Sequence, residues 1–293
     1  MSTPLNSGTE DARKWFFTDE QLNNPPSVRL GMSIEEELAQ RQNAAMLIRA
    51  ISDKLWEFLK NRPNALCTCT AMVYMQRFYM YHPFQRYPAQ MMAPCFLFLA
   101  CKSEEQPIKL DYVIKTSFLL SHPNRPEVPE REQFRLYNEL IRNENLLLQT
   151  IGFDFTVQHP HSVVIESSTE LNIHKSVSSL AFRMATNSLH FSKMSLKYDF
   201  KTIAIVCLKV ALKSNDLEME PREWYLRINP KLTPEELGKV EKEFIELPKK
   251  YKAFAKYLSP ESRTQSNSQQ RQRFAPSTVE PTTPDSGVSS LRS

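Results

Sequence analysis

Glycine is scarce in this chain of 293 residues, which contains only five. Because glycine supplies the left-handed backbone of many tight turns and phosphate-binding loops, few of these features are expected. Alternation of apolar and polar residues is also rare, whereas apolar residues recur at three- and four-residue steps. We therefore expect a nearly all-helical chain, in which most of the 20 prolines stop helices or lie near the C-terminus.

Long apolar runs and a strong net charge are lacking as well. The longest apolar run, Ala93 to Cys101, is too short to cross a bilayer, and no signal peptide is recognisable. We expect no membrane association. The net charge of +4 is too small to indicate nucleic-acid binding by itself. The five cysteines are odd in number and lie mostly in apolar helical runs, which predicts reduced core residues of an intracellular protein.

Catalytic and metal-binding signatures are missing too. The chain has no dinucleotide-binding or phosphate-binding glycine motif, no serine-hydrolase elbow and no zinc-protease motif. His159-Pro160-His161 is more typical of a turn into a helix than of a metal site, and Cys67-Thr68-Cys69 lacks zinc or redox spacing. We expect no enzyme activity, cofactor or metal. Lysines between 239 and 256 suit a helix C-terminus, although a patch for nucleic acid or an acidic partner stays open.

Start and stop signals divide the chain into predicted helices. Thr18 and Ser33 each precede a Gln or Glu at capping-box spacing, Pro63 breaks the helix that Ser33 begins, and Gly152 fits a C-cap. Apart from the helices that begin after Thr18 and Ser33, the expected helices lie near 64–81, 93–105, 108–121, 130–151, 161–172, 175–191, 199–214, 222–228 and 234–257.

The second half of the chain weakly repeats the first. Ala100–Ser103 lines up with Ala211–Ser214, and Phe78 lines up with Leu189, both at an offset of 111 residues. Helical patterns follow in a similar order in both halves, which predicts two five-helix units.

We divide the chain accordingly. Residues 1–13 are polar and expected to be flexible. The first unit, with the short N-terminal helix, spans 14–155, and the second spans 156–258. Residues 259–293 are rich in Ser, Thr, Gln and Pro and are expected to form a disordered tail, because they cannot bury enough apolar surface to fold.

The apolar helix near 93–105 carries one stripe whose residue types do not suit a core. Phe98, Lys102 and Glu105 fall at i, i+4 and i+7, and therefore place a ring, a cation and an anion on one face. Later in the chain, Glu144 stands alone in a second apolar stripe. We interpret Lys102 and Glu144 as part of a surface that docks another protein. An ion pair between them that only holds two helices together stays open as the alternative, and both roles can coexist.

Short motifs with a characteristic order and spacing extend over residues 14–257. They are Trp15-Phe16-Phe17-Thr18, Arg41-Gln42, Val73-Tyr74-Met75, the run from Phe98 to Pro107, Leu148-Gln149-Thr150-Ile151-Gly152-Phe153, His159-Pro160-His161 and the run from Met184 to His190. In this pattern the chain resembles the cyclin T family, the regulatory subunits of the positive transcription elongation factor b kinase. The resemblance implies an all-α double cyclin fold and does not cover the tail.

The resemblance implies a regulatory cyclin rather than an enzyme. Such a protein binds and activates a cyclin-dependent kinase of the elongation-factor b type in the nucleus, and thereby promotes phosphorylation of the RNA polymerase II C-terminal domain and transcription elongation. Lys102 and Glu144 match family positions that contact the kinase near its mobile C-helix, and Phe98, Glu105 and Phe153 match further kinase-facing positions. A contact of the chain itself with the polymerase domain stays open.

One departure and two rival functions bear on this interpretation. Cell-cycle cyclins carry an apolar substrate-docking patch where this chain has Gln40–Ala44, which is too polar for that use and indicates the transcriptional branch. A double cyclin fold that clamps promoter DNA is disfavoured by the mild charge and by the acidic end of the 93–105 helix. A cyclin that pairs with a different transcriptional kinase, or with a splicing factor, stays open.

Overall fold

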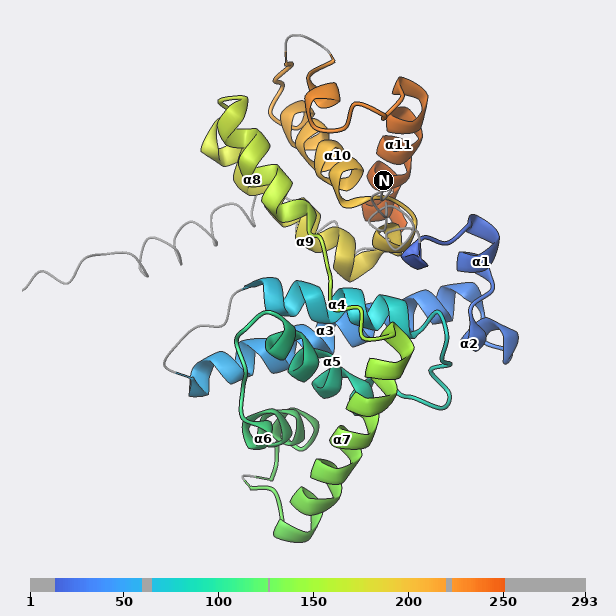
Figure 1. The fold of residues 1–293 in the computed structure, drawn as a ribbon, viewed down its shortest axis with the longest axis vertical. Coiled ribbons are helices and arrows are strands. Elements are labelled where there is room, and N and C mark those ends of the chain that lie inside the picture. The colour runs from blue at the N-terminus through green and yellow to red at the C-terminus, as the bar shows by residue number, and fades with distance from the viewer. Residues whose placement is uncertain (1–13, 60–64, 126, 220–222, 251–293) are drawn as a thin grey trace, which may run out of the picture.

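The computed structural model describes residues 14–59, 65–125, 127–219 and 223–250, and helices are the regular elements of these segments. The helices form two stacked units joined by an extended segment between α7 and α8 (Figure 1). This confirms the all-helical prediction. The predicted flexible N-terminus, the predicted tail and the last part of the predicted 234–257 helix lie outside the described residues.

Within the described residues, the first unit contains seven α-helices, two of which are very short. They are α1 (Asp19–Asn23), α2 (Pro26–Arg29), α3 (Ile34–Phe58), α4 (Ala65–Phe78), α5 (Ala89–Ser103), α6 (Leu110–Ser121) and α7 (Glu130–Ile151). Both predicted capping boxes form, at Thr18 before α1 and at Ser33 before α3, and Gly152 ends α7 with φ 62°. The sequence did not indicate α2, because a four-residue helix is too short to show a period.

The second unit contains α8 (Pro160–Glu170), α9 (Lys175–Phe191), α10 (Phe200–Lys213) and α11 (Pro234–Lys250). Two 3-10 segments, η2 (Met194–Leu196) and η3 (Trp224–Arg227), complete it. The short helix predicted near 222–228 is therefore a single 3-10 turn, η3. Pro160 starts α8 at a position where its missing N–H costs no hydrogen bond.

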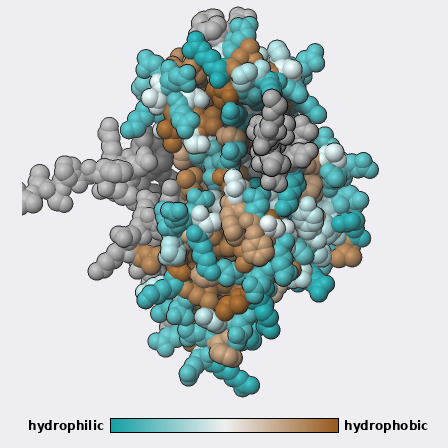
Figure 2. Space-filling view, viewed as in Figure 1, coloured by the Kyte–Doolittle hydropathy of each residue, from teal (hydrophilic) through white to brown (hydrophobic). Residues whose placement is uncertain are grey.

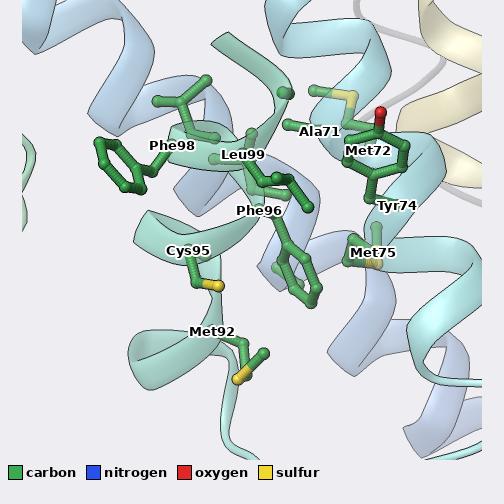
Figure 3. Packing of buried hydrophobic residues seen from close by; sticks show 14 of the residues in the cluster. Ala71, Met72, Tyr74, Met75, Met92, Cys95, Phe96, Phe98 and Leu99 are labelled. Carbon is green, nitrogen blue, oxygen red and sulfur yellow. The ribbon is translucent and has the colours of Figure 1, made fainter. Parts of the chain in front are cut away.

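Helix α5 lies at the centre of the first unit and packs against α3, α4, α6 and α7, which explains why it is apolar on nearly every side. Figure 3 shows Phe96 directed toward Met75 of α4, while Phe98 leaves α5 on a different side. All five cysteines are buried and none is in a disulfide bond, as predicted from their apolar surroundings.

Helices α5 and α10, one in each unit, end in the same way. Glu105 after α5 and Asp216 after α10 both have left-handed backbone, with φ 56° and 54°. In both places the next residue donates its N–H back into the helix, from Gln106 to the carbonyl of Cys101 at 2.8 Å and from Leu217 to that of Leu212 at 3.1 Å. The sequence repeat at an offset of 111 residues thus has a physical counterpart.

A buried polar network joins the two units. Arg41, which is fully buried, donates to Glu37 and to the side chain of Gln76 at 2.8 Å. Gln76 in turn donates to the carbonyl of Ser192 at 3.2 Å, and Lys193 donates to Glu37 at 3.3 Å. Lys193 also donates to the carbonyl of Leu22 at 2.6 Å, and because these buried polar groups need their partners, the network holds one relative placement of the units.

Candidate partner-docking site

Lys102 and Glu144 meet where the end of α5 packs against α7. The ammonium of Lys102 donates to Oε1 of Glu144 at 2.7 Å. The Lys102 side chain is 43% exposed, whereas that of Glu144 is 11% exposed. The intramolecular ion pair that the sequence left as an alternative is therefore present in the free chain, at the edge of the first unit rather than in its core.

The ring of Phe98 lies against the Lys102 ammonium of this pair. Phe98 lies one helical turn before Lys102 on α5, and the Lys102 ammonium stands 4.1 Å from the centroid of its ring. The Phe98 residue itself is only 6% exposed. A cation above an aromatic face gains about 0.5–2 kcal/mol. In the free chain Phe98 therefore orients Lys102 and offers little surface of its own.

Glu105 does not share the helical stripe that its spacing predicted. Helix α5 ends at Ser103, and Glu105 lies beyond it in the left-handed turn, where it is exposed. The i+7 spacing from Phe98 therefore has no meaning at this position, because helical periodicity stops with the helix. Glu105 remains accessible at the same end of α5, but through its turn rather than through a helix face.

Phe153 is presented by a turn at the end of α7. It follows Gly152, has φ 57° and is 63% exposed. Left-handed backbone at a phenylalanine is uncommon and has to be held by its surroundings. Trp15 supplies part of that restraint, since its indole N–H donates to Asp154 at 2.8 Å. Tyr74 adds a hydrogen bond to the carbonyl of Phe155 at 3.1 Å.

Two exposed aromatic residues of α7 escaped the sequence analysis. Phe134 is 71% exposed and Tyr137 is 40% exposed. They precede Ile141 and Glu144 at steps of three and four residues, so all four share one face of α7. The spacing was visible in the sequence, but whether that face was buried was not.

Comparison with known proteins bears directly on this arrangement. The family model "Cyclin, N-terminal domain" matches residues 16–156, and "Cyclin-T2-like, C-terminal domain" matches residues 159–247. Cyclin-T2 of Mus musculus is 37% identical over 247 residues, and Cyclin-T1 of Homo sapiens is 35% identical over 241. This chain belongs to the cyclin T family. Cyclins are regulatory proteins rather than enzymes.

These alignments cover 82% and 80% of this cyclin but only 33% and 32% of the two relatives, so the chain spans about a third of their length. Among solved structures, a chain of the yeast RNA Pol II CTD kinase CTDK-1 complex matches with TM-score 0.66 and 18% identity, over 94% of this cyclin and 86% of that chain. A chain of the yeast TFIIK (Kin28/Ccl1/Tfb3) complex matches with TM-score 0.57 and 19% identity, over 82% and 98%. At such identities these matches show the fold alone.

The second unit of this cyclin has an ion-paired site at the equivalent place. Lys213 at the end of α10 lies 111 residues after Lys102, and it forms an ion pair with Glu241 of α11, as Lys102 does with Glu144 of α7. Lys209 takes the place of Phe98 and binds the other oxygen of Glu241 at 2.9 Å. Burial raises the pKa of Glu241, but hydrogen bonds and charges from the two lysines outweigh this and lower it overall. Both oxygens of Glu241 are thus neutralised within the unit.

The two histidines of the His159-Pro160-His161 motif form hydrogen bonds within the protein. His159 pairs through Nε2 with Thr70 at 2.8 Å, and His161 pairs through Nε2 with Thr186 at 2.9 Å. The described residues contain no cluster of three or more His, Cys, Asp or Glu that could hold a metal ion. Within the same residues, every helix is too short or too polar to span a membrane.

Proposed function

We propose that this cyclin is the regulatory subunit of a cyclin-dependent kinase of the elongation-factor b type. In this proposal it acts in the nucleus, binds and activates the kinase, and so promotes phosphorylation of the RNA polymerase II C-terminal domain and transcription elongation. The observation that carries the proposal is the Lys102–Glu144 pair at the surface of the first unit, between exposed Phe153 and the exposed aromatics of α7.

This surface has the chemistry of a protein interface. Its rings at Phe134, Tyr137 and Phe153 offer apolar area of the kind enriched in interface cores. The Lys102 ammonium has three donors, and Glu144 takes one of them. The remaining donors can bind carbonyl oxygens of the kinase while the pair stays intact, so the structural and docking roles coexist.

Activation follows from differential binding. A cyclin seated on the C-helix side of the kinase holds that helix inward, so that the kinase's own lysine–glutamate pair and metal site form. The cyclin shifts the population of the active state only by as much as it prefers that state. Under this proposal the cyclin supplies position and the kinase supplies the chemistry.

Co-purification from cells tests the partner. The tagged full chain should bring down a cyclin-dependent kinase in one-to-one ratio, identified by mass spectrometry, and the complex should phosphorylate a polymerase C-terminal-domain peptide. A splicing factor, or a kinase that does not phosphorylate that peptide, would show that the proposed partner is wrong.

Alanine substitutions and a charge reversal test the docking residues. Lys102→Ala and Glu144→Ala should each weaken kinase binding by roughly 2–5 kcal/mol, because each leaves a charge unpaired at the contact. The double variant Lys102→Glu/Glu144→Lys restores the internal ion pair with reversed polarity, and should fold normally yet still bind poorly. Lys213→Ala is the matched control, since it changes the equivalent site of the second unit and should leave kinase binding intact. Full binding by the double variant would assign the pair a purely structural role.

A further inference from the structure

Helix α7 carries a stripe of arginines on its outer side. Arg131, Arg135 and Arg142 stand at i, i+4 and i+11, and all three are exposed. These steps bring the three side chains to one face of the helix, over about 16 Å of its axis. Asn138, at i+7, completes the arginine stripe. A shallow hollow in the surface is lined by these four residues together with Phe134 and Ile141.

Two of the three arginines have no acidic partner in the part of the chain that the structure describes. Arg135 pairs with Glu132 and Glu139, at 3.6 and 3.5 Å, whereas no ion pair within the described residues involves Arg131 or Arg142. Glu132 and Glu139 lie on the side of the stripe that faces α6, where both line a small cavity between α6 and α7. The two unpaired guanidinium groups therefore leave the outer side of the stripe positively charged.

The arginine stripe and the Lys102–Glu144 pair flank the same group of apolar side chains. Around the axis of α7, starting from Glu144, the side chains of Tyr137, Ile141 and Phe134 come first and the arginines follow. Figure 2 shows hydrophobic residues surrounded by hydrophilic ones in the lower half of the molecule, the region that α7 occupies in Figure 1. The surface thus has an apolar centre with cationic groups on both sides, which matches the core and rim of a protein interface.

A protein that covers this apolar centre has to match cations on both sides of it. Lys102 keeps further donors besides the one that binds Glu144, and each guanidinium of the stripe presents a planar fork that fits a carboxylate. Among the carboxylates of α7 only Glu130 is exposed, and it lies at the N-terminal end, where the helix dipole favours it. A basic partner face would be repelled. The fitting face therefore has an apolar pocket with carboxylates beside it.

We propose that the arginine stripe steers the partner kinase onto this surface by attracting an acidic patch of that kinase, and thereby favours kinases that carry such a patch. The inference rests on the proposed function, because it takes the kinase as the occupant of the surface around Phe134. Charges at the rim of an interface attract the partner over a distance and raise the association rate, whereas side chains at the centre mainly set the dissociation rate. The arginines therefore control how fast the complex forms, and Phe134 controls how long it lasts.

Binding kinetics of the full chain on the immobilised kinase that co-purifies with it test the inference by surface plasmon resonance. Arg131→Gln/Arg142→Gln should lower the association rate constant about tenfold at low ionic strength, and should change the dissociation rate constant by less than about twofold. The difference in association should shrink at about 0.5 M salt, because salt screens separated charges. Phe134→Ala should have the opposite effect, with dissociation about tenfold faster and association nearly unchanged.

Two control variants separate this effect from net charge and from side-chain shape. Arg29→Gln/Lys175→Gln removes two charges from exposed positions in α2 and α9, and should associate as fast as the parent. Arg131→Lys/Arg142→Lys keeps the charge of the stripe and should retain most of the association rate. Parental association by Arg131→Gln/Arg142→Gln, or equal slowing in either control, would overturn the inference and leave the proposed function intact. If the parent chain bound no kinase, the proposed function would fail, and the inference with it.

Discussion

Phe98 shows how one buried residue can act on a surface through its neighbour. The residue is 6% exposed, yet the ammonium of Lys102 lies 4.1 Å from the centroid of its ring, and Lys102 in turn pairs with Glu144. The family resemblance assigns a kinase-facing role to all three residues. In the free chain only Lys102 is substantially exposed, which makes Phe98 a residue that positions Lys102.

The substitution Phe98→Leu separates direct from indirect contact. Leucine keeps an apolar side chain in the core and removes the aromatic face, so stability should change by about 1 kcal/mol or less. Kinase affinity should fall less than in Lys102→Ala, because the ammonium is still present but less well oriented. Isothermal titration calorimetry against the purified kinase measures the affinities of the two variants, and urea denaturation measures the stability of Phe98→Leu. A larger loss for Phe98→Leu than for Lys102→Ala would mean that Phe98 itself enters the interface.

Three buried histidines make stability depend on pH. Burial lowers the pKa of His159 from 6.5 to about 4, with a smaller effect of Arg77, and lowers those of His161 and His190 to about 3. Below their ordinary pKa of 6.5 the unfolded chain therefore takes up protons that the folded chain does not. Stability is then highest above that pH and falls as the pH drops toward 4.

Melting temperatures between pH 7 and pH 5 test this dependence. Each histidine should lower the free energy of unfolding by on the order of 2 kcal/mol between pH 7 and pH 5, so the melting temperature should fall markedly over this range. His161→Gln, whose amide can replace the hydrogen bond to Thr186, should flatten the curve. A melting temperature that is constant over this range would show that these side chains titrate normally in the folded protein.

At the scale of elements, the turn after α7 depends on a segment far away in the sequence. Trp15 binds Asp154, and Lys14 reaches the carbonyl of Ile151 at 3.5 Å, so the residues before α1 hold the end of α7. A Cβ at Gly152 would lie 2.8 Å from the Lys14 ammonium, at a φ of 62° that favours glycine. The exposed position of Phe153 thus depends on the N-terminal segment as well as on α7.

Trp15→Phe should loosen this turn. Phenylalanine keeps most of the buried ring but loses the 2.8 Å hydrogen bond to Asp154, which should cost about 1–3 kcal/mol of stability because Oδ2 of the charged acceptor loses its partner. Kinase affinity should fall together with stability, since Phe153 is less well held. Urea denaturation and kinase titration measure the two effects. Phe17→Leu, which changes a nearby aromatic without touching Asp154, is the control and should leave kinase affinity unchanged.

At the scale of the whole molecule, the Arg41 network decides how the two units sit on each other. Arg41 and Glu37 have no exposed side-chain surface, and Lys193 from the second unit joins them at Glu37. Arg41 lies in Gln40–Ala44, the stretch where the family resemblance places the apolar substrate patch of cell-cycle cyclins. Within this stretch Arg41 and Gln42 bind residues of the interior, Gln42 through the carbonyl of Phe191 at 3.2 Å, whereas Gln40 and Asn43 are exposed.

Arg41→Met should uncouple the units. It leaves the Glu37 carboxylate buried with fewer partners, which should cost about 3–5 kcal/mol. Scanning calorimetry should then show a lower and broader transition, or two transitions, because each unit keeps its own core. Arg49→Met is the control: its exposed pair with Asp53 should contribute less than about 1 kcal/mol. A single sharp transition at the original temperature would rule out this role for the network.

Local rules in the sequence determined the helices and their ends. Capping boxes at Thr18 and Ser33 and the glycine C-cap at Gly152 depend on residues within one turn, so they could be predicted without a partner. The same holds for the apolar character of α5 and for the repeat at Lys102 and Lys213. The family resemblance added the identity of the fold.

The tertiary structure alone decided which side chains face outward and which meet. Periodicity placed Phe98, Lys102 and Glu105 on one stripe, but α5 ends at Ser103, and Phe98 is buried with the Lys102 ammonium over its ring. The exposed Phe134 and the Trp15–Asp154 contact depend on elements far apart in the chain. Such contacts depend on how complete helices pack, and no local sequence pattern encodes that packing, because each helix can bury its apolar face against several partners.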